Sequence, residues 1–306
     1  MSCPRFALVA LALASLASPG GAQARNPRAE LVVTPAWLAQ HLKDLDLVLL
    51  HVGDKAEYEK AHIAGARYVT QRDVALSSMD HDKGLMLEVP PADSLRDRLA
   101  ALGISDKSRV VVYYGNDWVS PSTRILFTLD HAGLGDRSAL LDGGLVAWKE
   151  AGLPVTTEVP APRTGQLSAL KVQPRVVGID YVRANLGKPT FHLVDGRAAV
   201  FYDGIEEGNN RKGHIPGARS IPFTEIADDK NRIRSAAELT KLFADAGIGP
   251  KDTVVAYCHI GQQATAVLFA ARSLGHPVLL FDGSFQEWGR RTDLPVENPA
   301  DGKTKP

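Results

Sequence analysis

The sequence predicts an α/β protein made of two tandem copies of one domain, each a central parallel sheet flanked by helices. Two observations support this fold class. Three sequence blocks recur in the same order in both halves of the 306-residue chain, and each half alternates short apolar strands with helical patterns. A repeat of roughly 120 residues is far longer than a solenoid unit and matches a whole domain.

Three pairs of blocks define the repeat. HIAGAR at 62–67 returns as HIPGAR at 214–219, GISDKSRVVVYY at 103–114 returns as GIGPKDTVVAYC at 247–258, and LLDGGLVAWKEAGLPV at 140–155 returns as LFDGSFQEWGRRTDLPV at 280–296. The second pair aligns without gaps, so Tyr114 stands opposite Cys258. The conserved order of the blocks indicates a duplicated domain.

Each half contains the same series of expected elements. In order they are a helix, a buried strand, a loop ending in the His-Ile-x-Gly block, a short strand, a second helix, another strand, a third helix and a last strand. All of them except the third helix are placed at 34–44, 47–52, 67–69, 91–104, 109–114 and 139–144, and again at 178–188, 191–195, 219–223, 235–248, 253–257 and 278–284. Short apolar strands are typical of a parallel sheet that is covered on both faces.

Domain limits follow from the repeat. We expect the first domain at residues 30–156 and the second at 174–298. The segment between them, 157–173, belongs to a stretch rich in Pro and Thr, which is typical of an extended connector.

The first 24 residues have the pattern of a signal peptide. Arg5 precedes an apolar run at 6–17, and Ala-Gln-Ala at 22–24 is a small-x-small cleavage site. The alternative is an uncleaved membrane anchor, but the apolar run is too short to span a bilayer. We therefore expect a periplasmic or secreted protein whose mature chain begins near Arg25.

Composition excludes some classes of function. Lys+Arg and Asp+Glu both number 35, so the formal net charge is zero, and a nucleic-acid binder would usually show a basic excess. Cys3 lies in the expected signal peptide, and the one remaining cysteine and the scattered histidines give no ligand spacing for a metal site. We expect no nucleic-acid partner, no metal and no cofactor.

Cleavage would remove Cys3 and leave Cys258 as the single cysteine of the mature chain. A lone cysteine in an oxidising compartment is a reactive thiol, one half of an intermolecular disulfide, or a buried small hydrophobe. Cys258 directly follows the strand at 253–257 and precedes a loop that leads into a helix near Ala264. Loop N–H groups and the positive end of that helix would stabilise a thiolate there. We therefore expect a nucleophile with a lowered pKa.

The paired blocks, with a cysteine in the second half alone, resemble the tandem-domain rhodanese sulfurtransferases, which act on thiosulfate or 3-mercaptopyruvate. The resemblance covers essentially the whole mature chain. It implies a catalytic second domain, a first domain that has lost its nucleophile at Tyr114, and an active site that faces the cleft between them. It further implies that Cys258 carries a sulfur, as a persulfide, from a small anionic donor to a thiophilic acceptor such as cyanide or a thiol. Two domains that close one cleft make a monomer sufficient.

The resemblance also assigns residues that bind the donor. Arg197 matches the family's anion-binding arginine, and a guanidinium at the carboxyl end of a strand can hold a sulfonate or carboxylate in a two-pronged contact. The alternative for Arg197 is a structural ion pair with Asp195. His62 and His214 lie in the repeated block of both halves, including the half without a nucleophile, so we expect them to be structural.

The active-site loop departs from both types of relative. It places His259, Ile260, Gly261, Gln262 and Gln263 beside the cysteine, and we expect all five to contact the donor. Thiosulfate-type relatives have basic residues at the first two of these positions, and mercaptopyruvate-type relatives have Gly and Ser. A second arginine typical of the mercaptopyruvate type would fall near position 201, where this chain has a phenylalanine. Thiosulfate is therefore the favoured donor, and 3-mercaptopyruvate is the second.

The same cysteine could serve three other functions. A Cys-dependent phosphatase needs an arginine six positions after the cysteine, where this chain has Ala264. A dithiol oxidoreductase needs Cys-x-x-Cys, and residue 261 is glycine. A non-catalytic sulfur carrier or binding module would use Cys258 in the same way, and only turnover distinguishes it from an enzyme.

Overall fold

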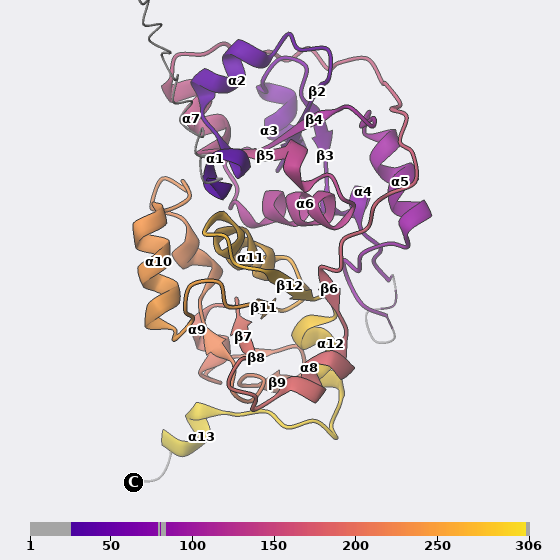
Figure 1. Cartoon of the computed structure of the whole chain (residues 1–306). Helices are drawn as coiled ribbons and strands as arrows, with labels where there is room; N and C mark the ends of the chain where they lie inside the picture. Colours follow the sequence, from indigo (N-terminus) through magenta and orange to yellow (C-terminus); the bar gives the residue numbers. More distant parts are fainter. Residues whose placement is uncertain (1–25, 79, 81–83, 304–306) are drawn as a thin grey trace, which may run out of the picture.

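Two five-stranded sheets, one in each half of the chain, form the framework of the protein. The computed structural model describes residues 26–78, 80 and 84–303, so the expected signal peptide lies outside the described residues. Figure 1 shows the first half above the second, with helices α6 (Ser120–His131) and α11 (Gln263–Ser273) between the two sheets.

Both sheets are parallel and have the same strand order. The first runs β1 (Val32–Val33), β5 (Ser138–Leu141), β4 (Arg109–Tyr114), β2 (Leu47–Val52) and β3 (Arg67–Val69). The second runs β6 (Val176–Val177), β12 (Val278–Phe281), β11 (Val254–Tyr257), β7 (His192–Asp195) and β10 (Arg219–Ser220). The predicted fold class, a duplicated α/β domain with a parallel sheet in each copy, is confirmed.

Most helices cover the two sheets or join the strands. The longer ones besides α6 and α11 are α2 (Pro35–His41), α3 (Lys55–Lys60), α5 (Ala92–Ala101), α7 (Gly144–Glu150), α8 (Ile179–Asn185), α10 (Ala236–Asp245) and α12 (Ser284–Arg290). Short turns are α1 (Pro27–Leu31), α4 (Gln71–Val74), α9 (Ala199–Tyr202), α13 (Pro299–Lys303) and the 3₁₀ segments Gly135–Arg137 and Phe223–Ile226. Local sequence explains where α10 begins, because Ser235 and Glu238 form a reciprocal capping box.

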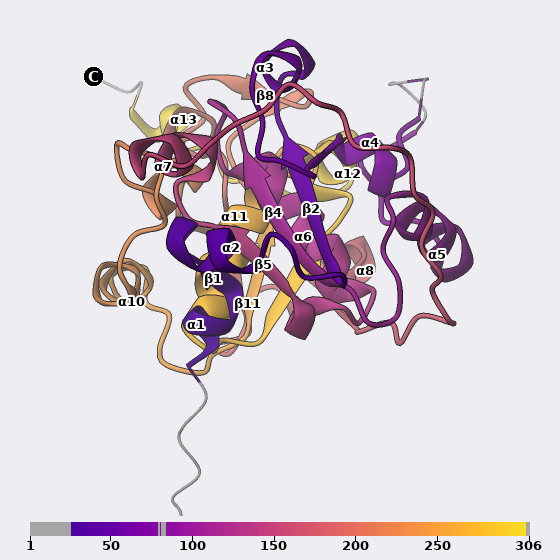
Figure 2. The same ribbon diagram turned by 90° about the horizontal axis from the view of Figure 1, so that it is seen from above.

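The apolar core has three parts. One lies on the outer face of the first sheet around Trp148, and one lies on the outer face of the second sheet around Trp288. The third part is continuous across both halves, because α6 and α11 pack between the sheets and join their inner faces. Figure 2, seen from above, shows α6 and α11 beneath the strands of the first sheet. The two copies therefore share a core.

Reciprocal contacts join the copies. The Asp142 carboxylate accepts the Ile233 N–H at 3.1 Å, and Asp282, its equivalent in the repeat, accepts the Val89 N–H at 2.7 Å. Val89 and Ile233 are themselves equivalent, since each lies three residues before α5 or α10. Equivalent residues that pair reciprocally are typical of two copies related by an approximate twofold axis.

Within the described ranges, no helix has the length and apolar character that crossing a bilayer requires.

Candidate active site

Cys258 lies at the carboxyl end of β11, at the centre of the second sheet, and its side chain is fully buried. Five residues, 258–262, connect β11 to α11, and we call residues 258–263 the active-site loop. The position agrees with the general rule that ligands bind beyond the carboxyl ends of parallel strands.

Backbone N–H groups surround the sulfur of Cys258. Those of Ile260, Gly261, Gln263 and Ala264 are close enough to lower the pKa of the thiol by hydrogen bonding. Burial has the larger effect and raises the pKa above its ordinary value, because a buried thiolate loses its hydration. The expectation of a lowered pKa is therefore wrong. The expected convergence of loop N–H groups on the sulfur is present.

Ser284, at the start of α12, also holds the cysteine and was missed by the sequence reasoning. Its hydroxyl oxygen accepts the Cys258 N–H at 3.2 Å, and the Phe285 N–H donates to the Cys258 carbonyl at 2.9 Å. Ser284 has a φ of 52°, an unusual conformation for a residue with a side chain. The signal in the sequence was the change from Asp-Gly-Gly at 142–144 to Asp-Gly-Ser at 282–284.

Arg197 lies beside the cysteine and is fully buried. Its Nε and Nη2 atoms donate to the Asp195 carboxylate, Nη2 also donates to the Gly213 carbonyl at 2.8 Å, and the guanidinium stacks 4.0 Å above the Phe285 ring. The structure therefore contains the ion pair with Asp195 that was weighed as the alternative role. Among the described residues, Nη1 has no hydrogen-bond partner.

Asp195 also sets the ionisation of this arginine. Burial lowers the pKa of Arg197, but the hydrogen bond and charge of Asp195, with smaller contributions from Tyr257 and Cys258, raise it above its ordinary value. The guanidinium therefore remains a cation next to the sulfur.

A two-stranded hairpin, β8 (Glu207–Gly208) and β9 (Arg211–Lys212), covers this arginine and the next loop residue. The Oδ1 atom of its turn residue Asn209 accepts a hydrogen bond from Nδ1 of His259 at 2.9 Å, and a Cβ at Gly208 would lie 3.2 Å from Nη1 of Arg197. Burial lowers the pKa of His259 to about 4, so the ring is neutral. No strand pattern in the sequence predicted this hairpin.

The remaining loop residues lie around the sulfur in different ways. Ile260 is half-buried, and Gln262 donates from Nε2 to the Ser120 hydroxyl of the first domain at 3.3 Å. Gly261 has a φ of 79°, which favours glycine, and the buried Oε1 of Gln263 has no partner among the described residues. The expectation that His259 to Gln263 contact the donor stays a prediction.

Tyr114 fills the equivalent position in the first domain. Its side chain is buried, and its hydroxyl donates to the Asn231 carbonyl of the second domain at 2.5 Å. A Cβ at Gly144, the equivalent of Ser284, would lie 2.5 Å from the Tyr114 carbonyl oxygen. This copy of the site therefore contains no nucleophile and serves the contact between the domains.

Ser120 of the first domain contacts the active-site loop, and the segment just before Ser120 also contacts the second domain. Trp118 is 47% exposed, and its ring meets Phe223 of the second domain edge to face at 5.7 Å.

The histidines of the repeated block have structural contacts: His62 Nδ1 bonds to the Tyr58 carbonyl at 2.7 Å, and His214 Nδ1 bonds to the Tyr202 carbonyl at 2.8 Å.

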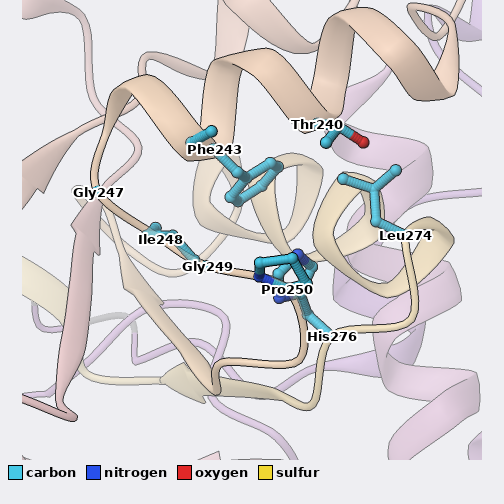
Figure 3. A pocket seen from close by; sticks show the side chains of 9 residues that line it. Thr240, Phe243, Gly247, Ile248, Gly249, Pro250, Leu274 and His276 are labelled. Atoms are coloured by element: carbon cyan, nitrogen blue, oxygen red, sulfur yellow. The ribbon is translucent and has the colours of Figure 1, made fainter.

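A cavity of about 430 Å³ lies at the other end of β11, away from the cysteine (Figure 3). Phe243 of α10, Leu274 and His276 line it, together with Ile248 and Pro250 of the loop before the strand. It shares no residue with the active-site loop.

Over the described ranges no group of three or more His, Cys, Asp or Glu could hold a metal ion.

Comparison with known proteins decides the family. The Rhodanese-like domain model matches residues 34–151 and again residues 179–291. The chain belongs to the rhodanese family. The match covers both halves, as the internal repeat predicts.

Several rhodanese relatives align with nearly the whole chain. A thiosulfate sulfurtransferase of Azotobacter vinelandii is 30% identical over 270 residues, which cover 87% of this chain and 97% of the relative. A mitochondrial thiosulfate/3-mercaptopyruvate sulfurtransferase of Arabidopsis thaliana is 29% identical over 303 residues, covering 88% and 78%. The solved structure of SseA from Escherichia coli, a 3-mercaptopyruvate sulfotransferase, has a TM-score of 0.72 and 26% identity, covering 83% and 98%. These relatives confirm the expected enzyme class, a sulfurtransferase.

Proposed function

We propose that this rhodanese-family chain moves a sulfane sulfur from a small anionic donor to a thiophilic acceptor through a persulfide on Cys258. One arrangement carries the proposal: the buried sulfur lies among backbone N–H groups, beside the cation Arg197 whose Nη1 has no partner among the described residues. N–H groups that converge on one point stabilise a thiolate, and they would stabilise the terminal sulfur of a persulfide equally.

In the first step the Cys258 thiolate attacks the outer sulfur of thiosulfate. A new S–S bond forms at the cysteine, the S–S bond of thiosulfate breaks, and sulfite leaves with the electron pair. The enzyme then holds the transferred sulfur as a persulfide anion. No external oxidant or reductant takes part.

In the second step a nucleophilic acceptor attacks the outer sulfur of the persulfide. With cyanide, a C–S bond forms, the persulfide S–S bond breaks, and thiocyanate leaves while the Cys258 thiolate is regenerated. With a thiol acceptor the product is a low-molecular-weight persulfide. The two steps together give ping-pong kinetics.

Thiosulfate is the donor that we favour. Arg197 offers one free nitrogen to a donor oxygen, and burial strengthens such a charge-assisted contact. The Ile260 side chain cannot bind an anion or donate a hydrogen bond, and the His259 ring is neutral. Among the described residues, Arg197 is the cation left to meet a donor, because Arg124 is engaged by Asp282 and the Gly261 carbonyl. The small dianion thiosulfate fits this site better than 3-mercaptopyruvate, whose carboxylate and carbonyl groups would both require partners. 3-Mercaptopyruvate remains the second candidate donor.

Steady-state kinetics test this function. Thiosulfate and 3-mercaptopyruvate are compared side by side, with cyanide as the acceptor, on the wild type and on Cys258→Ala. We expect parallel double-reciprocal lines for the wild type, a higher kcat/KM with thiosulfate, and no turnover by Cys258→Ala. Undiminished turnover by Cys258→Ala would contradict the mechanism.

A second candidate function is a sulfur carrier that loads once and delivers its sulfur to a protein partner. The complete burial of Cys258 favours it, because a buried persulfide is protected from small thiols. A carrier would accept one sulfur from thiosulfate and then show no turnover with cyanide or small thiols. The kinetic comparison above therefore separates the two functions.

We also propose export, with cleavage near Arg25, and a monomer with domains at residues 30–156 and 174–298 joined by a connector at 157–173. The pattern at residues 1–24 and the single cleft of two domains support this. The intact mass of the exported protein, and its mass in solution by light scattering, test both. Retention of Met1 or a stable dimer would contradict them.

A further inference from the structure

Arg124 of the first domain reaches into the active site of the second. It lies on α6 and is fully buried. Its Nη1 donates to the Gly261 carbonyl at 3.0 Å, and Nη1 and Nη2 each lie 3.0 Å from Oδ1 of Asp282. Nη2 also donates to the Leu87 carbonyl. One guanidinium thus ties the active-site loop to a loop of the first domain.

Arg124 contacts Gly261, the residue of the active-site loop with a left-handed backbone. Gly261 directs its N–H toward the sulfur of Cys258, where this N–H lowers the pKa of the thiol. On its other side, its carbonyl is held by Arg124, and a Cβ added at Gly261 would lie 2.8 Å from Nη1. The φ of 79° and this close approach both require glycine. Residue 261 is therefore fixed between the nucleophile and the arginine.

The arginine breaks the symmetry between the two domains. Thr123 and Thr265 are equivalent residues of α6 and α11, because each lies the same number of residues before the C-cap of its helix, Ala132 or Leu274. The equivalent of Arg124 is therefore Ala266. The reciprocal contacts of Asp142 and Asp282 exist on both sides without it. The guanidinium is present on the side of Cys258, and its equivalent position carries none.

A purely structural role explains this arginine poorly. Burying a guanidinium is costly, and an apolar residue of similar volume often stabilises an interface equally well. The domains are also joined at the far end of α6, where Asp130 lies 2.8 Å from Nε of Arg175 and 3.1 Å from Nη2 of Arg272.

We propose that Arg124 is a positioning residue for sulfur transfer. Arg124 holds the Gly261 carbonyl so that the loop N–H groups converge on Cys258. Through this arginine, the domain without a nucleophile takes part in catalysis. The role in turnover depends on the function proposed above. The role in stabilising the thiolate does not, and it can be measured without any sulfur donor.

The experiment compares Arg124→Met with Asp130→Asn, a matched variant that weakens another contact between the domains without touching the loop. The first readout is the ultraviolet absorbance of the Cys258 thiolate as pH rises, with Cys258→Ser subtracted. The second is kcat and KM for thiosulfate. Thermal melting of each variant reports the loss of stability.

We expect Arg124→Met to move the thiolate titration to higher pH and to lower kcat by roughly ten- to a hundredfold, less than the roughly hundred- to thousandfold loss for removing a preorganised donor outright, because the loop N–H groups are displaced and not removed. KM for thiosulfate should change by less than about twofold, because Arg197 is intact. Asp130→Asn should lower the melting temperature and leave the titration and kcat near the wild type. Arg124→Lys should recover part of kcat, since one ammonium can still reach the Gly261 carbonyl.

Two results would overturn the proposal: an unchanged titration and kcat in Arg124→Met, or equal losses in Asp130→Asn. If Arg124→Met does not fold because Asp282 is left without its cation, the charge-neutral double variant Arg124→Met/Asp282→Asn is measured against the same expectations. A wild type without turnover would contradict the proposed function alone, because the titration would still report on Arg124.

Discussion

The hydroxyls of Thr123 and Thr265 lie 3.0 Å apart where α6 and α11 cross between the two sheets. The two residues are equivalent in the repeat, so the approximate twofold axis of the molecule passes between them. Each hydroxyl carries one proton and also lies within hydrogen-bond distance of a carbonyl oxygen, that of Ser120 for Thr123 and that of Gln262 for Thr265. One hydroxyl therefore donates to its carbonyl while the other donates across the pair. The contact joins the start of the active-site helix to the domain that lacks a nucleophile.

This pair predicts coupled stability effects. We expect Thr123→Val and Thr265→Val each to lower the free energy of unfolding by about 1 kcal/mol, because each leaves its partner hydroxyl with one contact fewer. The double variant should lose less than the sum, with a coupling of about 0.5–1 kcal/mol. Denaturant unfolding of the four proteins measures the cycle, and strict additivity would show that the hydroxyls do not interact.

Arg197 predicts a change in donor binding. Arg197→Lys keeps a cation for Asp195 and removes the guanidinium nitrogen that has no partner in the described structure. Losing one charge-assisted contact of about 1.5 kcal/mol should raise KM for thiosulfate roughly tenfold. The rate at which a preformed persulfide reacts with cyanide should change much less. Steady-state and single-turnover assays separate these two effects.

The control for this change is Arg211→Lys. Arg211 lies in β9 of the hairpin that covers Arg197, and its Nη1 donates to the Leu294 carbonyl at 2.8 Å. Its KM should stay within about twofold of the wild type. An Arg197→Lys enzyme with unchanged KM would mean that Arg197 only supports Asp195. Arg197→Ala is a poor test, since it leaves the Asp195 carboxylate buried without a cation.

The burial of Cys258 predicts an alkaline pH profile. Burial raises the pKa of the thiol. The charged groups around the loop are the Arg197–Asp195 pair and the Arg124–Asp282 pair, and the ring of His259 is neutral. The thiolate is the nucleophile, so its fraction, and with it kcat/KM for thiosulfate, should increase continuously with pH through neutrality. Initial rates across the pH range test this. A plateau that begins in the acidic range would show that the thiol is acidic in the working enzyme.

His51 predicts a loss of stability in acid. It takes the place of Asp195 in the first domain, is fully buried, and burial, with the charge of His62, lowers its pKa from 6.5 to about 4. Between pH 6.5 and 4 the unfolded chain binds a proton that the folded chain does not, so stability falls as pH falls. Over this window the loss is on the order of 3 kcal/mol.

The variant His51→Phe keeps an aromatic ring between Tyr58 and Tyr113 and cannot bind the proton. Its free energy of unfolding should fall less between pH 6.5 and 4 than that of the wild type. Equal slopes in the two proteins would show that His51 is not the group responsible.

The fold was predictable because its signals are local and occur twice. Each buried strand stands out as an apolar run, and the alignment of Tyr114 with Cys258 needs no knowledge of contacts. The hairpin at 207–212 was not predictable, since its strands have two residues each and no apolar pattern. Its turn uses the two positive-φ residues Asn209 and Asn210, which was the available signal.

The site was predictable only in part. The strand-to-helix position of Cys258 gives the convergence of N–H groups. The pKa of the thiol depends on burial, which arises only once distant segments such as α12 pack against the loop. Arg124 could not be found from sequence, because 158 residues separate it from Asp282 and the contact exists only once the domains dock. Arg197 makes the ion pair with Asp195 that was one of its two expected roles, and its role in binding the donor stays a prediction.

The central claim is that Cys258 carries the transferred sulfur. The most direct measurement is the mass of the protein after treatment with thiosulfate, followed by peptide mapping. We expect the mass of one added sulfur atom on the peptide that contains Cys258, its loss on addition of cyanide, and no adduct on Cys258→Ala. An adduct on another peptide, or thiocyanate formation by Cys258→Ala at the rate of the wild type, would contradict the account.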